Sequence, residues 1–151
     1  MPGIIVGVDG SNNSRRALGW AMHEAVQHQL PLEIMTVEPG PVRPVTGIYW
    51  GVHPGNSFKP ELAQKALQKF VDSVASEIGG TVPEITLSVA KGEVAEELIR
   101  ASRDADMLVV GSRGSGGFSR LLLGSTSSQV THHAACPVVV VPGTHQAARG
   151  S

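Results

Sequence analysis

The sequence predicts an α/β fold, in which a parallel sheet is wrapped by helices. Short β-branched runs alternate with longer segments of helical period along the chain, which is typical of this class. Most of the short runs are apolar throughout, as expected for strands that are covered on both faces. The length of 151 residues suits a single domain with its own core.

Each apolar run predicts one strand. The predicted strands are Ile4 to Val8, Leu32 to Val37, Ile85 to Val89, Met107 to Val110 and Val138 to Val141. The third differs from the others because its apolar residues alternate with polar ones, which favours an edge position with one face in water.

Helical periodicity predicts four helices between these strands. They cover about 13–29, Pro60 to Ile78, Glu93 to Ser102 and Ser125 to Ala135. Ser11 or Ser14 can cap the first helix, and Pro60 is pre-shaped for the first turn of the second. Gly79 and Gly80 end that second helix.

Two segments match no regular element. Pro39 to Ser57 is rich in proline and glycine, and we interpret it as a variable loop that serves as a mobile flap. Residues 144–151 are small and polar and predict a disordered tail. The predicted domain is therefore 1–143.

Composition excludes several classes of function. Twelve Lys and Arg residues against thirteen Asp and Glu residues give a net charge of −1, so there is no basic field for nucleic acid or an anionic membrane. No apolar stretch approaches the roughly 20 residues that span a bilayer, and we expect a soluble, cytoplasmic protein. Cys136 is the only cysteine and predicts a buried, inert thiol. The scattered histidines favour no structural metal site.

A glycine- and serine-rich stretch follows the fourth strand, from Gly111 to Ser128. Ligands of open α/β sheets collect at the carboxyl ends of the strands, where helix N-termini present free N–H groups to anions. Glycines there can adopt positive φ and let main-chain N–H groups approach phosphate oxygens. The residues suited to this chemistry are Gly111, Gly114, Gly124, Ser125, Thr126 and Ser127, with Arg113 as either a phosphate-binding cation or a solvated surface charge. No Walker A motif occurs, and no G-x-G-x-x-G follows the first strand.

The spacing of these residues resembles a known family. Gly111, Gly114, Gly124 and Ser125 form the G-x2-G-x9-G-[S/T] pattern of universal stress proteins that bind ATP. The resemblance extends to "IIVGVDGS", "KGEVAEELI", "DMLVVGSRG" and "ACPVVVV", and so covers nearly the whole chain except 39–57 and the tail. It implies an adenine nucleotide alpha hydrolase-like sheet in the order 3-2-1-4-5 and a homodimer.

The resemblance also implies a nucleotide-binding set at the gap between the first and fourth strands. Gly7, Val8 and Asp9 match the strand end that borders the nucleoside, with Asp9 near the ribose and the metal-bound phosphates, and Val37 matches the residue that holds the adenine edge through its backbone. Val110, Gly111, Arg113 and Gly114 match the turn beneath the ribose and phosphates, and Gly124, Ser125, Thr126 and Ser127 match the phosphate-binding helix start. Mg²⁺ would bind through the phosphates, with Asp9 as a candidate ligand. From the residues alone, Asp9 can equally cap the helix that follows it.

Four functions remain open at this point. The first is an ATP-binding regulatory or stress-response module with at most slow hydrolysis, because no base or transition-state cation is apparent beyond Asp9 and Arg113. The others are a genuine ATP hydrolase or phosphotransferase with Pro39 to Ser57 as its lid, a binder of AMP or cyclic AMP, and an adapter that meets a partner through Tyr49 and Trp50. On the strand order that the resemblance implies, Val138 to Val141 lies at a sheet edge, and its four valines, as an uncovered apolar edge, would then predict a homodimer in which these strands pair.

Overall fold

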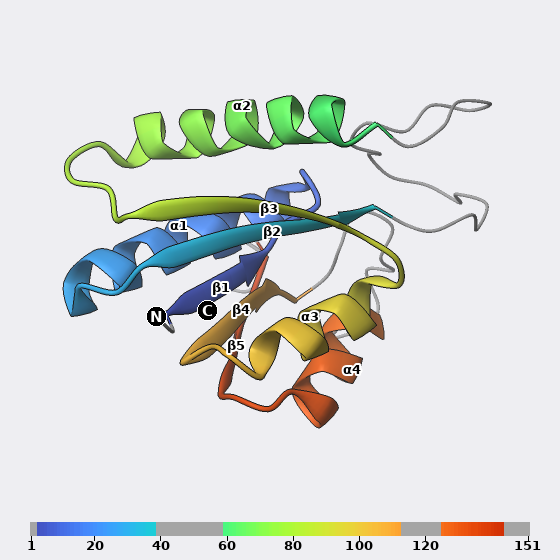
Figure 1. Ribbon diagram of the computed structural model, residues 1–151. Coiled ribbons are helices and arrows are strands. Elements are labelled where there is room, and N and C mark those ends of the chain that lie inside the picture. Colours follow the sequence, from blue (N-terminus) through green and yellow to red (C-terminus); the bar gives the residue numbers. More distant parts are fainter. Residues whose placement is uncertain (1–2, 39–58, 113–124, 144–151) are drawn as a thin grey trace.

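Five parallel strands in the order β3-β2-β1-β4-β5 form the centre of the structure (Figure 1). The computed structural model describes residues 3–38, 59–112 and 125–143. Its elements, in chain order, are β1 (Ile4–Gly7), α1 (Asn12–His28), β2 (Leu32–Glu38), α2 (Pro60–Ile78), β3 (Ile85–Lys91), α3 (Val94–Ser102), β4 (Met107–Gly111), α4 (Ser125–His133) and β5 (Val138–Val141). The predicted α/β class and the strand order implied by the family resemblance are both confirmed.

The register places β1 at the centre of the sheet. Ile4 is paired with Leu32 of β2 on one side and with Met107 of β4 on the other. β3 pairs only with β2, so the alternating strand lies at an edge, as its sequence pattern predicts. β5 forms the opposite edge beside β4.

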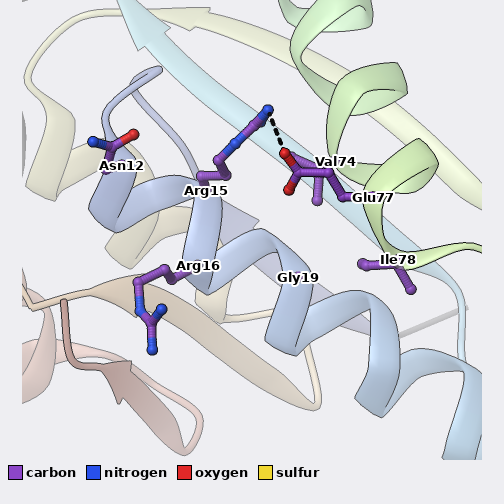
Figure 2. A pocket seen from close by; sticks show the side chains of 7 residues that line it. All are labelled: Asn12, Arg15, Arg16, Gly19, Val74, Glu77 and Ile78. Carbon is purple, nitrogen blue, oxygen red and sulfur yellow. Dashed lines mark ion pairs between the residues drawn. The ribbon is translucent and has the colours of Figure 1, made fainter. Parts of the chain in front are cut away.

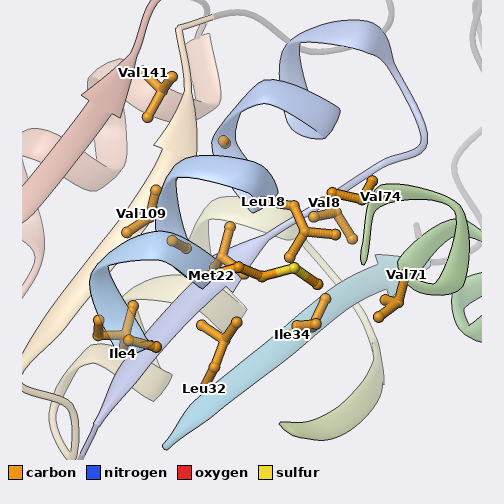
Figure 3. Packing of buried hydrophobic residues seen from close by; sticks show 14 of the residues in the cluster. Ile4, Val8, Leu18, Met22, Leu32, Ile34, Val71, Val74, Val109 and Val141 are labelled. Carbon is orange, nitrogen blue, oxygen red and sulfur yellow. The ribbon is translucent and has the colours of Figure 1, made fainter. Parts of the chain in front are cut away.

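Helices cover both faces of the sheet and enclose two hydrophobic cores. α1 and α2 pack on one face around Leu18, Leu67 and Ile34, all fully buried. Figure 3 shows Leu18 and Ile34 in this core. α3 and α4 pack on the other face around Leu98, Val130 and Leu108. A strand that is covered on both faces needs apolar side chains at every position, which explains the continuous run in β1.

The helix ends follow from their capping residues. Ser11 is the N-cap of α1, and its side chain accepts a hydrogen bond from the Ser14 N–H. Ser14, the alternative cap, is instead buried, and its Oγ donates to the Ser11 carbonyl at 3.0 Å. Pro60 occupies the first turn of α2, and Gly79 ends that helix at φ 70°, as predicted.

Two predicted boundaries differ from the structure by two residues, for identifiable reasons, and the others agree to within one residue. α4 ends at His133 rather than Ala135, because the Ala135 N–H donates to Ser102 Oγ at 2.8 Å instead of continuing the helix. β3 runs on to Lys91 rather than Val89, because β2 also extends and Glu38 pairs with Lys91.

The prediction of a buried Cys136 is wrong. The residue lies between α4 and β5, where it is only half-buried against the second core. This partial burial, together with the negative charge of Asp106, raises the pKa of the thiol. A raised pKa keeps the sulfur protonated and so weakly nucleophilic.

The predicted loop at 39–57 and the predicted tail at 144–151 lie outside the described residues. No helix within the described parts of the chain is long and apolar enough to cross a membrane.

Candidate functional site

The central strand stops before its neighbours at the carboxyl edge of the sheet. β1 ends at Gly7, and the Val8 N–H adds one more bond to the Met35 carbonyl at 2.9 Å. β2 continues beyond this level to Glu38, and β4 continues to Gly111. Beyond Gly7, therefore, no strand lies between the last residues of β2 and those of β4.

The main-chain groups of Val37 face the β1 side of β2. The Met35 carbonyl points toward β1, because it accepts from Val8, whereas the Glu38 carbonyl points toward β3 and accepts from Gly92 at 2.9 Å. Main-chain groups alternate in direction along a strand, so Val37 points the same way as Met35. Its N–H and C=O are thus directed past the end of β1.

Gly111 has the same relation to β1 from the opposite side. The N–H groups of Leu108, in β4, and of Ser112, directly after it, donate to the carbonyls of Pro137 and Val141, both at 2.9 Å. The main-chain groups of these even-numbered residues therefore point toward β5. Because main-chain groups alternate in direction along a strand, the N–H and C=O of Gly111 point the other way, toward β1. Val37 and Gly111, two members of the predicted set, therefore direct main-chain donors and acceptors toward each other across the end of β1.

Asp9 lies between them, in the turn from β1 to α1. Its Oδ1 accepts from the Ser11 N–H at 2.9 Å, and its own N–H donates to Ser14 Oγ at 3.3 Å. Gly10 adopts φ 83°, a conformation that favours glycine, and this completes the turn. The helix cap is Ser11, so the carboxylate of Asp9 shapes the turn rather than capping the helix.

The two described glycines of the predicted set lie where an added side chain would be crowded. A Cβ at Gly111 would lie 3.0 Å from the Asn13 carbonyl oxygen, and one at Gly7 would lie 3.1 Å from Leu98 Cδ2. Gly111 does not adopt positive φ, contrary to our expectation from the sequence. Its missing side chain instead lets the first turn of α1 approach the end of β4.

Side chains of two other predicted residues are turned into the cores. Val8 is 5% exposed in the core beneath α1, and Val110 is 4% exposed in the core beneath α3 and α4. A ligand at this edge can therefore contact them only through their main chain.

Ser127 connects the two ends of the glycine-rich stretch. Its side chain is 3% exposed, and its Oγ donates to the Ser112 carbonyl at 2.9 Å. This hydrogen bond ties the first turn of α4 to the end of β4. Of its neighbours, Ser125 is exposed and Thr126 is half-buried, while Arg113, Gly114 and Gly124 lie outside the described residues.

Replacing Ser127 with alanine should lower the free energy of unfolding by about 1–3 kcal/mol, because the buried Ser112 carbonyl loses its hydrogen-bond donor. Urea unfolding followed by circular dichroism measures this loss. Ser76→Ala, on the exposed side of α2, is the control and should change stability by no more than about 0.5 kcal/mol. Equal stability of the two variants would contradict a stabilising role for this hydrogen bond.

Sequence reasoning missed one ionisable residue at this edge. Glu38 directly follows Val37 and is 1% exposed, although carboxylates are rarely buried. The sequence signal that could have identified it is an acidic residue directly after the predicted strand Leu32 to Val37. Within the described ranges, no three His, Cys, Asp or Glu side chains are grouped so as to hold a metal ion.

Comparison with known proteins identifies the family. The model of the universal stress protein family matches residues 2–142. The chain belongs to this family. A universal stress protein of Mycolicibacterium smegmatis is 40% identical over 154 residues, which cover 99% of this chain and 51% of that protein. Universal stress protein YxiE of Bacillus subtilis is 31% identical over 144 residues, covering 91% of this chain and 97% of YxiE.

The chain spans about half the length of the mycobacterial universal stress proteins that it matches. Among solved structures, universal stress protein UspA from Lactobacillus plantarum has a TM-score of 0.71 at 23% identity and covers 93% of this chain and 97% of its own. A universal stress protein in complex with cAMP has a TM-score of 0.65 at 24% identity, and the match covers 93% of this chain and 95% of that one. An Arabidopsis thaliana family member with AMP bound has a TM-score of 0.62 at 19% identity, and the match covers 96% of this chain and 94% of that one. At these identities the likeness shows the universal stress protein fold.

Proposed function

We propose that this universal stress protein binds an adenine nucleotide, with ATP as the main candidate, at the carboxyl edge of the sheet. The observation that carries the proposal is the convergence of the main-chain groups of Val37 and Gly111 on either side of Asp9. A base edge and a ribose need such neutral donors and acceptors, and a phosphate chain needs N–H groups such as those at the start of α4. The family members solved with cAMP and with AMP support this class of ligand.

The residues at this edge also suit Mg²⁺ carried by a triphosphate. Mg²⁺ prefers oxygen ligands and is commonly bound through one or two carboxylates together with substrate phosphates. Asp9 offers such a carboxylate at this edge, in the turn where its Oδ1 accepts a hydrogen bond from the Ser11 N–H. Bound Mg²⁺ would neutralise phosphate charge, while Asp9 and the first turn of α4 orient the chain of phosphates.

The proposed role is regulatory binding in the cytoplasm rather than rapid turnover. Mass spectrometry of the ligand released from freshly purified protein, followed by calorimetric titration with ATP, AMP and cAMP, tests the proposal. Release of an adenine nucleotide and saturable binding are expected. Absence of both would overturn the proposal, and preference for AMP or cAMP would replace ATP as the ligand. ADP release at about 1 per second or faster with Mg²⁺ would favour the hydrolase alternative.

We also propose that two copies pair through β5, which forms an edge of the sheet and so offers main-chain groups to another chain. Val141 and Pro137 accept hydrogen bonds from β4, so Val138 and Val140 direct their main-chain groups away from it.

Val140→Pro should therefore abolish the dimer and leave the sheet intact, because proline removes an N–H that faces outward. Light scattering should show twice 15.8 kDa for the parent protein and 15.8 kDa for the variant. Val139→Pro is the matched control, because its missing N–H faces β4 and its loss should destabilise the fold. A parent protein that is monomeric, or a Val140→Pro variant that remains dimeric, would contradict pairing through β5.

A further inference from the structure

Ser14 places a buried hydroxyl in the first turn of α1, although the helix itself does not need one there. The residue is 4% exposed and shares the buried face of α1 with Ala17, Leu18 and Ala21. The helix cap is Ser11, so the side chain of Ser14 has no capping role. Alanine is the better helix former, and a buried hydroxyl is costly unless it is hydrogen-bonded. The reason for a hydroxyl at this position therefore lies outside the helix.

The Ser14 hydroxyl holds both ends of the turn that connects β1 to α1. Its Oγ accepts a hydrogen bond from the Asp9 N–H at 3.3 Å and donates one to the Ser11 carbonyl at 3.0 Å. A hydroxyl can do both at once, because it has one donor and two acceptor positions. Within the turn, Gly10 adopts φ 83°, and glycine has a wide choice of conformations. The two hydrogen bonds thus restrain a turn that its own sequence leaves free to rearrange.

The same turn sets the direction of the Asp9 carboxylate. Its Oδ1 accepts a hydrogen bond from the Ser11 N–H at 2.9 Å, so the side chain follows the main chain of Ser11. The Asp9 N–H and the Ser11 carbonyl are the two groups that the Ser14 hydroxyl holds. A shift at either end of the turn would reorient the carboxylate.

α1 gives the Ser14 hydroxyl a fixed support. In the groove between α1 and α2, Arg15 reaches across to Glu77, with its guanidinium 3.3 Å from a carboxylate oxygen (Figure 2). Arg16 donates from its Nε to the carbonyl of Pro142, directly after β5, at 3.2 Å. The two residues that follow Ser14 thus attach the start of α1 to α2 and to the end of β5. The hydroxyl is therefore held in place independently of the turn that it restrains.

We propose that Ser14 is a positioning residue of the nucleotide site, whose hydroxyl holds Asp9 in the orientation that Mg²⁺ carried by a triphosphate requires. This role rests on the proposed function, in which Asp9 is a candidate Mg²⁺ ligand. Ser14 itself is buried and would contact neither the metal nor the nucleotide. Loss of a group that orients a metal ligand commonly weakens metal binding about 10- to 100-fold. Ser14 should therefore matter far more for ATP with Mg²⁺ than for ATP without it.

Calorimetric titration of Ser14→Ala with ATP, in Mg²⁺ and in EDTA, tests the proposal. Compared with the parent protein, the variant should bind ATP at least about tenfold more weakly in Mg²⁺ and within about twofold in EDTA. Asp9→Asn should show the same pattern, and adding Ser14→Ala to it should cause no further loss, because one residue acts through the other. Ser14→Cys keeps the volume but bonds only weakly, so it should reproduce the loss even where the alanine variant is unstable.

Ser102→Ala is the matched control. Ser102 is also buried, and its Oγ donates to the Ile99 carbonyl at 2.6 Å and accepts from the Ala135 N–H at 2.8 Å, on the other face of the sheet. Loss of either hydroxyl removes the same kinds of hydrogen bond and should lower the Tm by a similar amount. Only Ser14→Ala should change the affinity for ATP with Mg²⁺.

Amide hydrogen exchange in the absence of nucleotide follows the turn directly. The Asp9 N–H should exchange faster in Ser14→Ala than in the parent protein, and at the parent rate in Ser102→Ala. Unchanged exchange at Asp9, parent affinity of Ser14→Ala in Mg²⁺, an equal loss in Ser102→Ala, or a further loss on the Asp9→Asn background would overturn the role of Ser14 and leave the proposed function standing. A parent protein that binds no adenine nucleotide would overturn both.

Discussion

Replacing Gly124 with valine is expected to abolish detectable ATP binding and to leave the fold intact. Gly124 directly precedes α4, where the proposed site requires main-chain N–H groups to approach phosphate oxygens. A β-branched side chain would occupy the position of the phosphate and remove two or more charge-assisted hydrogen bonds. At about 1.5–3 kcal/mol each, their loss weakens binding by more than about 100-fold. Calorimetric titration with ATP measures the change.

Gly117→Val is the matched control, because this glycine belongs to the same stretch but not to the G-x2-G-x9-G pattern. It should retain ATP affinity. Circular dichroism and thermal unfolding confirm that both variants are folded. An ATP titration that is the same for Gly124→Val as for the parent protein would refute the proposed phosphate contacts.

Replacing Leu18 with alanine is expected to lower the free energy of unfolding by about 2–5 kcal/mol. Leu18 is 0% exposed and packs beneath α1 near Val8 and Met22 (Figure 3), so the truncation leaves a cavity in the larger core. Domains of this kind have total stabilities of about 5–15 kcal/mol, so the loss is a large share.

Urea unfolding measures the effect of Leu18→Ala. Leu62→Ala is the control, because Leu62 is 41% exposed on α2 and its truncation should cost no more than about 0.5 kcal/mol. Similar losses in the two variants would contradict the packing described for the core.

Much of the fold follows from local patterns in the sequence. The run from Ile4 is apolar at every position because both of its sides are covered, and the alternation in Ile85 to Val89 marks the edge strand. Capping chemistry at Ser11 and Pro60 places the starts of α1 and α2. Such signals are local, so they can be recognised without knowing which segments pair.

The remainder depends on how distant segments meet. The directions of the main-chain groups of Val37 and Gly111 depend on the register with β1, which no local pattern specifies. The packing role of Gly111 requires Asn13 as its neighbour, and this residue lies almost 100 positions away in the sequence. Cys136 has apolar neighbours in the sequence, but it lies in the connection between α4 and β5, where its side chain is only half-buried.

The hydrogen bond from Ser127 to Ser112 has a consequence for how this fold diversifies. It joins the end of β4 to the first turn of α4, which are the two flanks of residues 113–124. For a flexible closed loop, doubling the length costs only about 0.6 kcal/mol. In the proposed nucleotide site, sequence changes between the two flanks would alter the contacts to the ligand, while this hydrogen bond keeps both flanks attached to each other.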